Sequence, residues 1–233
     1  MNQENESELI SQRERFDFHI QESELDQQVI RELKTRLTAD LRPVRALPSD
    51  GKLITLLVLF LAVFTALAAW PVHYFGLRAL TPTQLCLYFG VIAAAVILCA
   101  VALVQEMIPG SRRRIDPFIA IAAAVAGLVG TVMILFPSFD ATRFVRIGAG
   151  CFRYGSICGF ICGLLLALLL RRASFTSPFR GTIAACFLAS LAGVAVLAMH
   201  CPMLTASHIL VWHLGVLLLG ISAGAGLGEI ARI

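Results

Sequence analysis

Hydrophobic positions are concentrated in six stretches after residue 50, whereas polar and charged positions dominate the first 50 residues. Each stretch is near the ~20 residues that an α-helix needs to cross the hydrocarbon core of a bilayer. The pattern predicts six membrane spans, at Leu53–Trp70, Gln84–Val104, Pro117–Phe136, Tyr154–Leu170, Thr182–Met199 and Ile209–Leu227. We therefore expect two parts, a head of residues 1–50 and an all-α bundle of six transmembrane helices within residues 51–233.

The head has a periodicity of its own. Residues 1–20 are polar and irregular, which indicates a segment that is disordered or that becomes ordered only on binding. From about residue 22, apolar residues recur every four positions, which is the pattern of an amphipathic helix. They are Leu25, Val29, Leu33, Leu37 and Leu41. This helix could lie on the membrane surface or on the bundle, or it could bind a partner, and the periodicity leaves these alternatives open.

Composition and charge support a membrane location. Hydrophobic residues make up 58% of the chain and mean hydropathy is +0.81, above the roughly 45–50% apolar content of soluble domains. Only four of the 15 acidic residues follow Asp50, so the head is acidic and the bundle is basic. The net charge of +4 comes from basic residues spread over the membrane flanks, so we expect no direct contact with nucleic acid.

Loop charges give an orientation. Basic clusters precede the first span, separate the second from the third, and separate the fourth from the fifth. They are Arg42, Arg45 and Lys52; Arg112, Arg113 and Arg114; and Arg171, Arg172 and Arg180. Positive loops are retained in the cytoplasm, and the head lacks the apolar core of a signal peptide. We therefore expect a multi-pass protein of a bacterial inner membrane, with its head and both termini cytoplasmic.

Glycines within two of the spans repeat at intervals of four residues. They are Gly155, Gly159 and Gly163 in the fourth span, and Gly220, Gly224 and Gly228 in the sixth. Such faces let helices approach closely in lipid, so they predict helix packing and would permit a homodimer. The spans carry almost no ionisable residues, which argues against an ion pump or a proton-coupled transporter.

Candidate chemistry lies at the outer ends of the spans. Of seven cysteines, Cys151 precedes the fourth span and Cys201 follows the fifth, so both fall on the outer face. They could form a disulfide or bind a soft metal ion, with His200, His213 or His208 as further ligands. On an α-helix, His208 and His213 would be about 140° apart, a poor arrangement for joint ligation. Two packing cysteines beside interfacial histidines would give the same pattern.

Motifs of catalysis are missing from the sequence. There is no G-x-S-x-G, no H-E-x-x-H and no phosphate-binding P-loop. We therefore expect a protein that is not an enzyme and that has no resident cofactor, apart from a transient metal ion at Cys151 and Cys201.

Three motifs carry a resemblance to a known family. Residues 33–48, LKTRLTADLRPVRALP, resemble the segment before the first span in NrsF-like proteins (negative regulator of sigma F), which are six-span bacterial anti-sigma factors. Met199-His200-Cys201-Pro202 and Val211-Trp212-His213-Leu214-Gly215 are similar to two further motifs of that family. The similarity extends from about Glu24 to the C terminus.

The resemblance implies a function for both parts of the chain. The head would sequester an extracytoplasmic-function sigma factor through Leu25, Val29, Leu33, Leu37, Leu41, Arg42 and Arg45. Cys151 and Cys201 would sense a periplasmic stress, either a metal ion or an oxidant. Family members often carry acidic residues after His-Cys-Pro, whereas residues 203–206 here are Met-Leu-Thr-Ala. The main alternative is a transport or channel-associated subunit with a regulatory cytoplasmic helix.

Overall fold

The computed structural model describes residues 27–36, 49–108, 115–139, 144–171, 173 and 175–230. The chain divides into two units, Met1–Leu47 and Pro48–Ile233. In the first unit, residues 27–36 form a helix whose side chains are all exposed, including those of Val29 (57%) and Leu33 (58%). The other residues predicted to bind a partner, Leu25, Leu37, Leu41, Arg42 and Arg45, lie outside the described residues.

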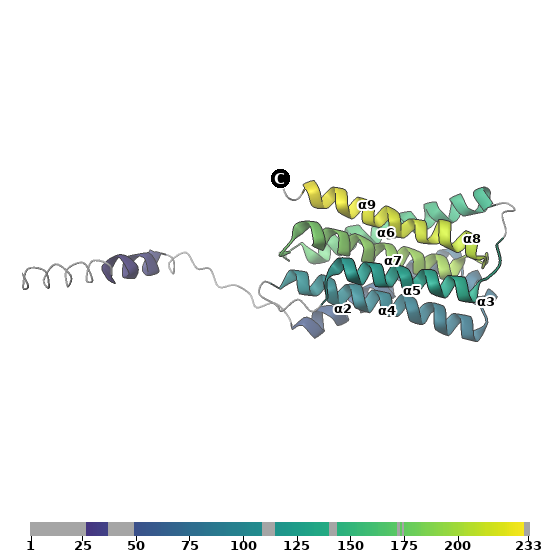
Figure 1. Cartoon of the computed structure of the whole chain (residues 1–233), viewed down its shortest axis with the longest axis horizontal. Coiled ribbons are helices and arrows are strands. Elements are labelled where there is room, and N and C mark those ends of the chain that lie inside the picture. Colours follow the sequence, from purple (N-terminus) through teal and green to yellow (C-terminus); the bar gives the residue numbers. More distant parts are fainter. Residues whose placement is uncertain are drawn as a thin grey trace, which may run out of the picture. The chain divides into compact units, whose positions relative to one another are not determined.

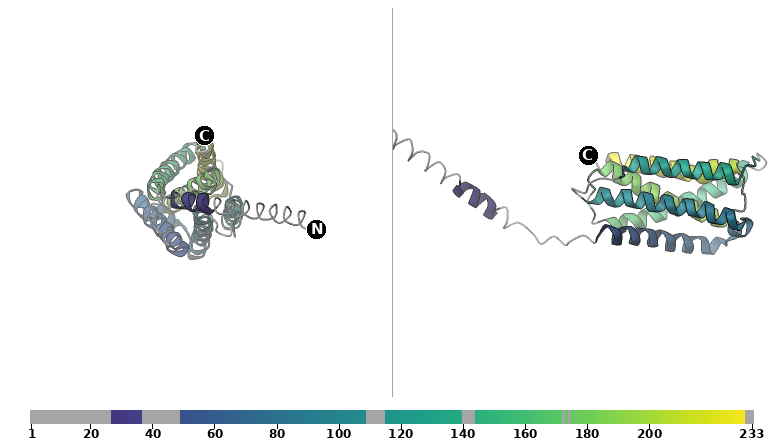
Figure 2. Two further views of the ribbon diagram at one scale, coloured as in Figure 1. Left: turned by 90° about the vertical axis from the view of Figure 1, so that its left-hand side faces the viewer. Right: turned by 60° about the horizontal axis from the view of Figure 1, so that its bottom comes forward.

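The second unit confirms the predicted all-α fold. Six helical segments are long and apolar enough to cross a membrane, and the described residues contain no strand. The elements are α2 (Asp50–Ala69) with η1 (Trp70–Val72), α3 (Phe75–Ala79), α4 (Pro82–Met107), α5 (Pro117–Leu135), α6 (Phe144–Leu170), α7 (Pro178–His200), α8 (Ala206–His208), η2 (Ile209–His213) and α9 (Leu214–Ile230). The long helices run side by side as a bundle (Figures 1 and 2).

Local sequence sets where several helices begin. The Thr81 hydroxyl accepts a hydrogen bond from the Gln84 N–H, and the Gln84 Oε1 accepts one from the Thr81 N–H, which forms a capping box at the start of α4. At the start of α5, the Asp116 carboxylate accepts a 2.8 Å bond from the Phe118 N–H. Both helices, like α7, have proline at their first position, where its missing N–H costs nothing.

Helix α7 is the central helix of the bundle. In its membrane-spanning stretch 78% of the residues are buried, against 22–44% in the other five spans. It packs against α2, α3, α4, α5, α6 and α9. All other long helices therefore present one face to α7 and another to lipid.

Glycines permit the closest of these contacts. A Cβ atom on Gly193 of α7 would collide with the carbonyl oxygen of Gly155 on α6. A Cβ on Gly220 or Gly224 of α9 would likewise collide with α7. This confirms the predicted packing role. These glycine contacts lie within one chain.

The two ends of the bundle differ in chemistry. One end, here named the cysteine end, comprises α3, α8, η2, the start of α6 and the end of α7 (Figure 1). The opposite end, named the arginine end, comprises the starts of α2, α5 and α7 and the ends of α4, α6 and α9. At the arginine end, Arg180 of α7 forms a 2.8 Å ion pair with Asp116, which joins α7 to α5.

Candidate functional site

Two cysteines far apart in the sequence meet at the cysteine end. The Sγ atoms of Cys151 and Cys201 are 3.5 Å apart. Cys151 is half-buried in the early turns of α6, while Cys201 is 2% exposed and directly follows α7. A disulfide has an S–S length of about 2.05 Å, so the two groups are thiols in contact. The bundle thus brings together the two cysteines that the sequence placed on one face.

Two histidines complete a cluster around these thiols. His208 ends α8, and its Nε2 lies 3.4 Å from the Cys201 Sγ. His213 ends η2, and the two imidazole centroids are 5.1 Å apart with planes at 78°. Both side chains are buried, with 2% and 1% exposed.

The proximity of the histidines corrects the expected separation of about 140°. That value assumed an α-helix, whereas residues 209–213 form a π-helix in which the Leu214 N–H donates to the Ile209 carbonyl. In a π-helix the hydrogen bond runs between residues five apart, so residues five apart share a face. His208 and His213 therefore face the cluster together.

The four side chains fit a metal ion. The ligand atoms of Cys151, Cys201, His208 and His213 all lie within 4.8 Å of one another. A tetrahedral site with bonds of about 2.3 Å to sulfur and 2.0 Å to nitrogen separates its ligand atoms by about 3.3–3.8 Å, so a small contraction would complete it. Both ring nitrogens of His213 are buried without a hydrogen-bond partner. An orphaned imidazole beside two thiols is a donor set for Zn²⁺ or a softer cation.

Electrostatics favour the ligating form of Cys201. The hydrogen bond from the Cys151 thiol lowers the pKa of Cys201, burial opposes this, and the imidazoles of His208 and His213 lower the pKa further. The thiolate is the form that binds metals and attacks oxidants. Cys201 is therefore prepared for either chemistry.

His200 lies outside the cluster. Its Nδ1 is 3.4 Å from the His73 carbonyl oxygen, and its ring packs against Phe75 and Tyr154, with centroid distances of 6.3 and 6.1 Å. His200 thus connects the end of α7 to the turn before α3. Of the four residues predicted for sensing, the structure brings together Cys151, Cys201 and His213.

Tyr88 is a neighbour of the cluster that sequence analysis missed. This α4 residue is 1% exposed, and its hydroxyl has no hydrogen-bond partner. Its ring packs edge-on against Phe136 at 5.7 Å, and its phenol lies close enough to Cys201 to interact with the thiolate charge. The feature of the sequence that could have pointed to this residue is the presence of a tyrosine near the start of an apolar span.

Trp212 fixes the π-helix against α6. Its indole occupies the space that a Cβ on Gly148 would need, and it packs edge-on against Phe152 with centroids 6.4 Å apart. The adjacent residue, His213, then faces the cluster. The Val-Trp-His motif thus combines a packing residue with a donor residue.

A family model described as NrsF, negative regulator of sigma F, matches residues 37–231, well over half of the chain. The match confirms the resemblance seen in the sequence, although it begins after the helix of residues 27–36 and thus later than Glu24. No curated protein and no solved structure matches the chain.

Proposed function

Because the chain belongs to the NrsF family, the negative regulators of sigma F, we propose that it is a membrane-bound anti-sigma factor with a thiol sensor. Its N-terminal segment sequesters a sigma factor of the extracytoplasmic-function class. Binding of a soft metal ion at the cysteine end, or oxidation there, releases that sigma factor. The observation that supports a sensor is the convergence of two thiols and two buried imidazoles from three transmembrane segments.

The exposed apolar side chains of residues 27–36 support a role in partner binding. Val29, Ile30 and Leu33 are each more than half exposed. Exposing these apolar side chains to water adds no stability to an isolated helix. An apolar groove on the sigma factor would cover them. The acidic residues of the head would meet basic sigma surfaces that otherwise contact promoter DNA or polymerase.

A charge introduced on the apolar face tests the head. Leu33→Glu places a carboxylate on the apolar face, so a reporter driven by the sigma factor should be on without any stressor. Gln28→Glu is the matched control, because it adds the same charge about 140° around the same helix and should leave repression intact. Full repression in the Leu33→Glu strain, with the protein present in membranes at the normal level, contradicts the assignment of this face.

The cluster is positioned to change how three helices pack. Cys151 belongs to α6, Cys201 to the end of α7, and the two histidines to the segment that leads into α9. A bound cation would supply a crosslink among these three helices. To shift a sigma factor from ~99% bound to ~1% bound, two bundle states must differ by about 5.5 kcal/mol in sigma affinity. Structural Zn²⁺ sites provide about 10–16 kcal/mol, which is enough.

Oxidation is a second candidate stimulus, favoured by the 3.5 Å contact between the sulfurs. Disulfide formation would remove two electrons and two protons from Cys151 and Cys201 and pass them to the oxidant. It would join α6 to α7 and leave the histidines free. The two stimuli therefore differ in whether the imidazoles are needed.

Reporter assays with each stimulus test whether the thiols are the sensor. Cys201→Ser should abolish induction by Cd²⁺ and by diamide while leaving basal repression intact. Cys86→Ser is the matched control, because Cys86 is an exposed thiol near the same end of the bundle. Normal induction of the Cys201→Ser strain by both agents removes the sensor proposal, and the head proposal would still stand.

We place the cysteine end in the periplasm and the arginine end in the cytoplasm of an inner membrane. Support comes from the basic residues before α2 and around the starts of α5 and α7. A membrane-impermeant maleimide applied to intact spheroplasts should label Cys86, and labelling only after lysis would invert this orientation.

A further inference from the structure

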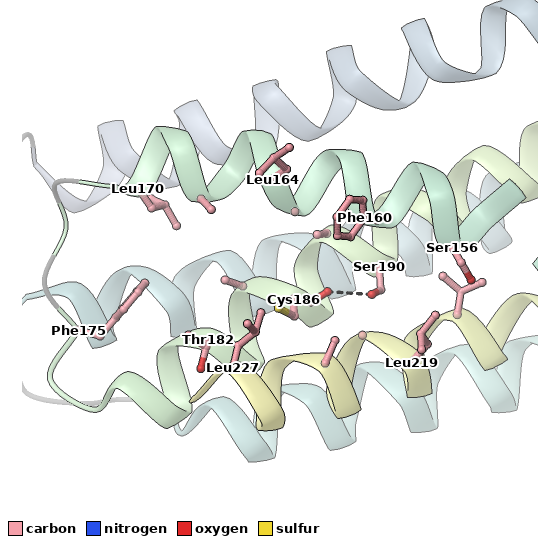
Figure 3. Close-up of a pocket in the computed structure, with 18 of the residues that line it drawn as sticks. Ser156, Phe160, Leu164, Leu170, Phe175, Thr182, Cys186, Ser190, Leu219 and Leu227 are labelled. Atoms are coloured by element: carbon pink, nitrogen blue, oxygen red, sulfur yellow. Dashed lines mark hydrogen bonds between the residues drawn. The ribbon is translucent and has the colours of Figure 1, made fainter. Parts of the chain in front are cut away.

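A groove runs along the membrane-facing side of the bundle between α6 and α9. The two helices form its walls and α7 forms its floor, as Figure 3 shows. Its volume is about 560 Å³. We name it the α6–α9 groove. Its ends are marked by Ser156 and Leu219 toward the cysteine end, and by Leu170 and Phe175 at the arginine end (Figure 3). Arg171, which directly follows α6, also lines the groove.

The lining of the groove suits a hydrocarbon. The Ser190 hydroxyl donates to the Cys186 carbonyl at 2.8 Å, and the Thr182 hydroxyl donates to the Pro178 carbonyl at 2.7 Å. The Ser156 hydroxyl oxygen is buried and has no hydrogen-bond partner. The side-chain hydroxyls of the lining are thus either bonded or hidden, and the exposed rims are large apolar residues such as Phe160 and Leu227.

The dimensions of the groove select a thin occupant. Ser156 of α6 and Arg171, which directly follows α6, are fifteen residues apart, which is about 22 Å along a helix. Dividing the volume of about 560 Å³ by this length gives a mean cross-section of roughly 25 Å². A helix 10–12 Å wide has a cross-section of roughly 80–110 Å², so a transmembrane helix of a second copy could cover the mouth of the groove but could not lie within it. A single hydrocarbon chain, whose carbon neighbours sit at about 4 Å, fits.

A positive charge stands at the open end of the groove. Arg171 is exposed, and it lines the groove directly after α6 ends. Within the described part of the chain it forms no ion pair, unlike Arg180, which is held by Asp116. A guanidinium at the level of the membrane surface is a recognition group for a phosphate.

We propose that the α6–α9 groove binds one acyl chain of a phospholipid from the arginine-end leaflet, with the lipid phosphate on Arg171. A leaflet contributes about 15 Å of hydrocarbon thickness, so a chain anchored at Arg171 lies within the length of the groove. The inference is independent of the proposed sigma-factor function.

Native mass spectrometry of the full-length protein tests this proposal. The protein is reconstituted with phosphatidylglycerol and released into mild detergent, and bound lipid is counted against added lipid. We expect one retained phospholipid per chain. Ala223→Phe fills the groove from α9 and should remove that lipid, whereas Ala126→Phe, the same change at an exposed position of α5, should keep it.

A second variant separates lipid loss from misfolding. Arg171→Gln changes only an exposed side chain, and it should weaken lipid retention about tenfold. This factor corresponds to the low end of the free energies known for a hydrogen bond to a charged group. Lys52→Gln, at the exposed start of α2 at the same end, is its control. Phosphatidylglycerol with a diazirine in its acyl chain should crosslink to α6, α7 or α9.

Three outcomes would overturn the proposal. They are the absence of a retained phospholipid, retention unchanged by both Ala223→Phe and Arg171→Gln, and crosslinks confined to α2, α4 or α5. Retention of a phosphate-free polycyclic lipid would also overturn it, since Arg171 would then have no ligand.

Discussion

Replacing His213 by alanine should weaken metal binding far more than replacing His200. Both are histidines at the cysteine end, but of these two only His213 has a ring nitrogen within 4.8 Å of both thiol sulfurs. The His200 ring is instead held at the His73 carbonyl. The pair therefore isolates the contribution of the cluster from the general effect of losing a histidine.

The size of the effect follows from the ligand count. A structural site with four ligands binds Zn²⁺ with about 10–16 kcal/mol, or about 3 kcal/mol for each ligand. Loss of one imidazole should therefore raise Kd by roughly 100-fold if nothing replaces it, and by less if water takes its place. His200→Ala should change Kd by less than about threefold, since this ring supplies no donor atom to the site.

Competition against a coloured chelator measures both values. Full-length protein in lipid nanodiscs is titrated with Cd²⁺ at constant pH, and near-ultraviolet absorption reports cadmium bonded to thiolate. Equal weakening by the two substitutions would refute a ligand role for His213. Tight binding that survives loss of Cys201 would refute the site as a whole.

Two further predictions concern the packing that holds the cluster in place. Gly193→Ala should lower the free energy of unfolding by about 1–3 kcal/mol, because its Cβ would collide with the Gly155 carbonyl. Gly150→Ala is the control and should be neutral, because there is open space around this residue. Unfolding by sodium dodecyl sulfate in mixed micelles measures both effects. Tyr154→Phe should cost about 0.6 kcal/mol through loss of the 2.9 Å hydrogen bond from its hydroxyl to the Ala68 carbonyl, and an unchanged unfolding midpoint in the same assay would mean that this bond adds no stability.

Most of the fold was accessible from sequence because the bilayer constrains it so strongly. Apolar stretches of about 20 residues have few alternatives to spanning helices, and each of the six predicted spans lies within an observed helical segment, apart from Phe136, one residue beyond α5. Proline and capping residues extended some ends, as after the Thr81 cap, where α4 begins at Pro82 and thus earlier than the predicted Gln84, whereas α5 begins at Pro117 as predicted.

The site was harder to predict because it depends on backbone irregularity and on helix order. The predicted topology placed Cys151 and Cys201 at one end of the bundle. Their contact also requires α6 to pack on α7, and the glycine faces permit this packing without selecting which helices pair. The π-helix before His213 has no local sequence signature, and it depends on Trp212 packing against α6. His200 was grouped with Cys201 because it is the adjacent residue, yet consecutive residues point in different directions.

Co-purification of the sigma factor with the tagged full-length protein, from host membranes with and without Cd²⁺, tests the account most directly. We expect a sigma factor of the extracytoplasmic-function class to be retained without Cd²⁺ and released with it. In the Cys201→Ser variant it should be retained under both conditions. Retention by the wild-type protein that is unaffected by Cd²⁺ and by diamide would contradict the sensor, and the absence of any sigma factor from the untreated complex would contradict the anti-sigma function itself.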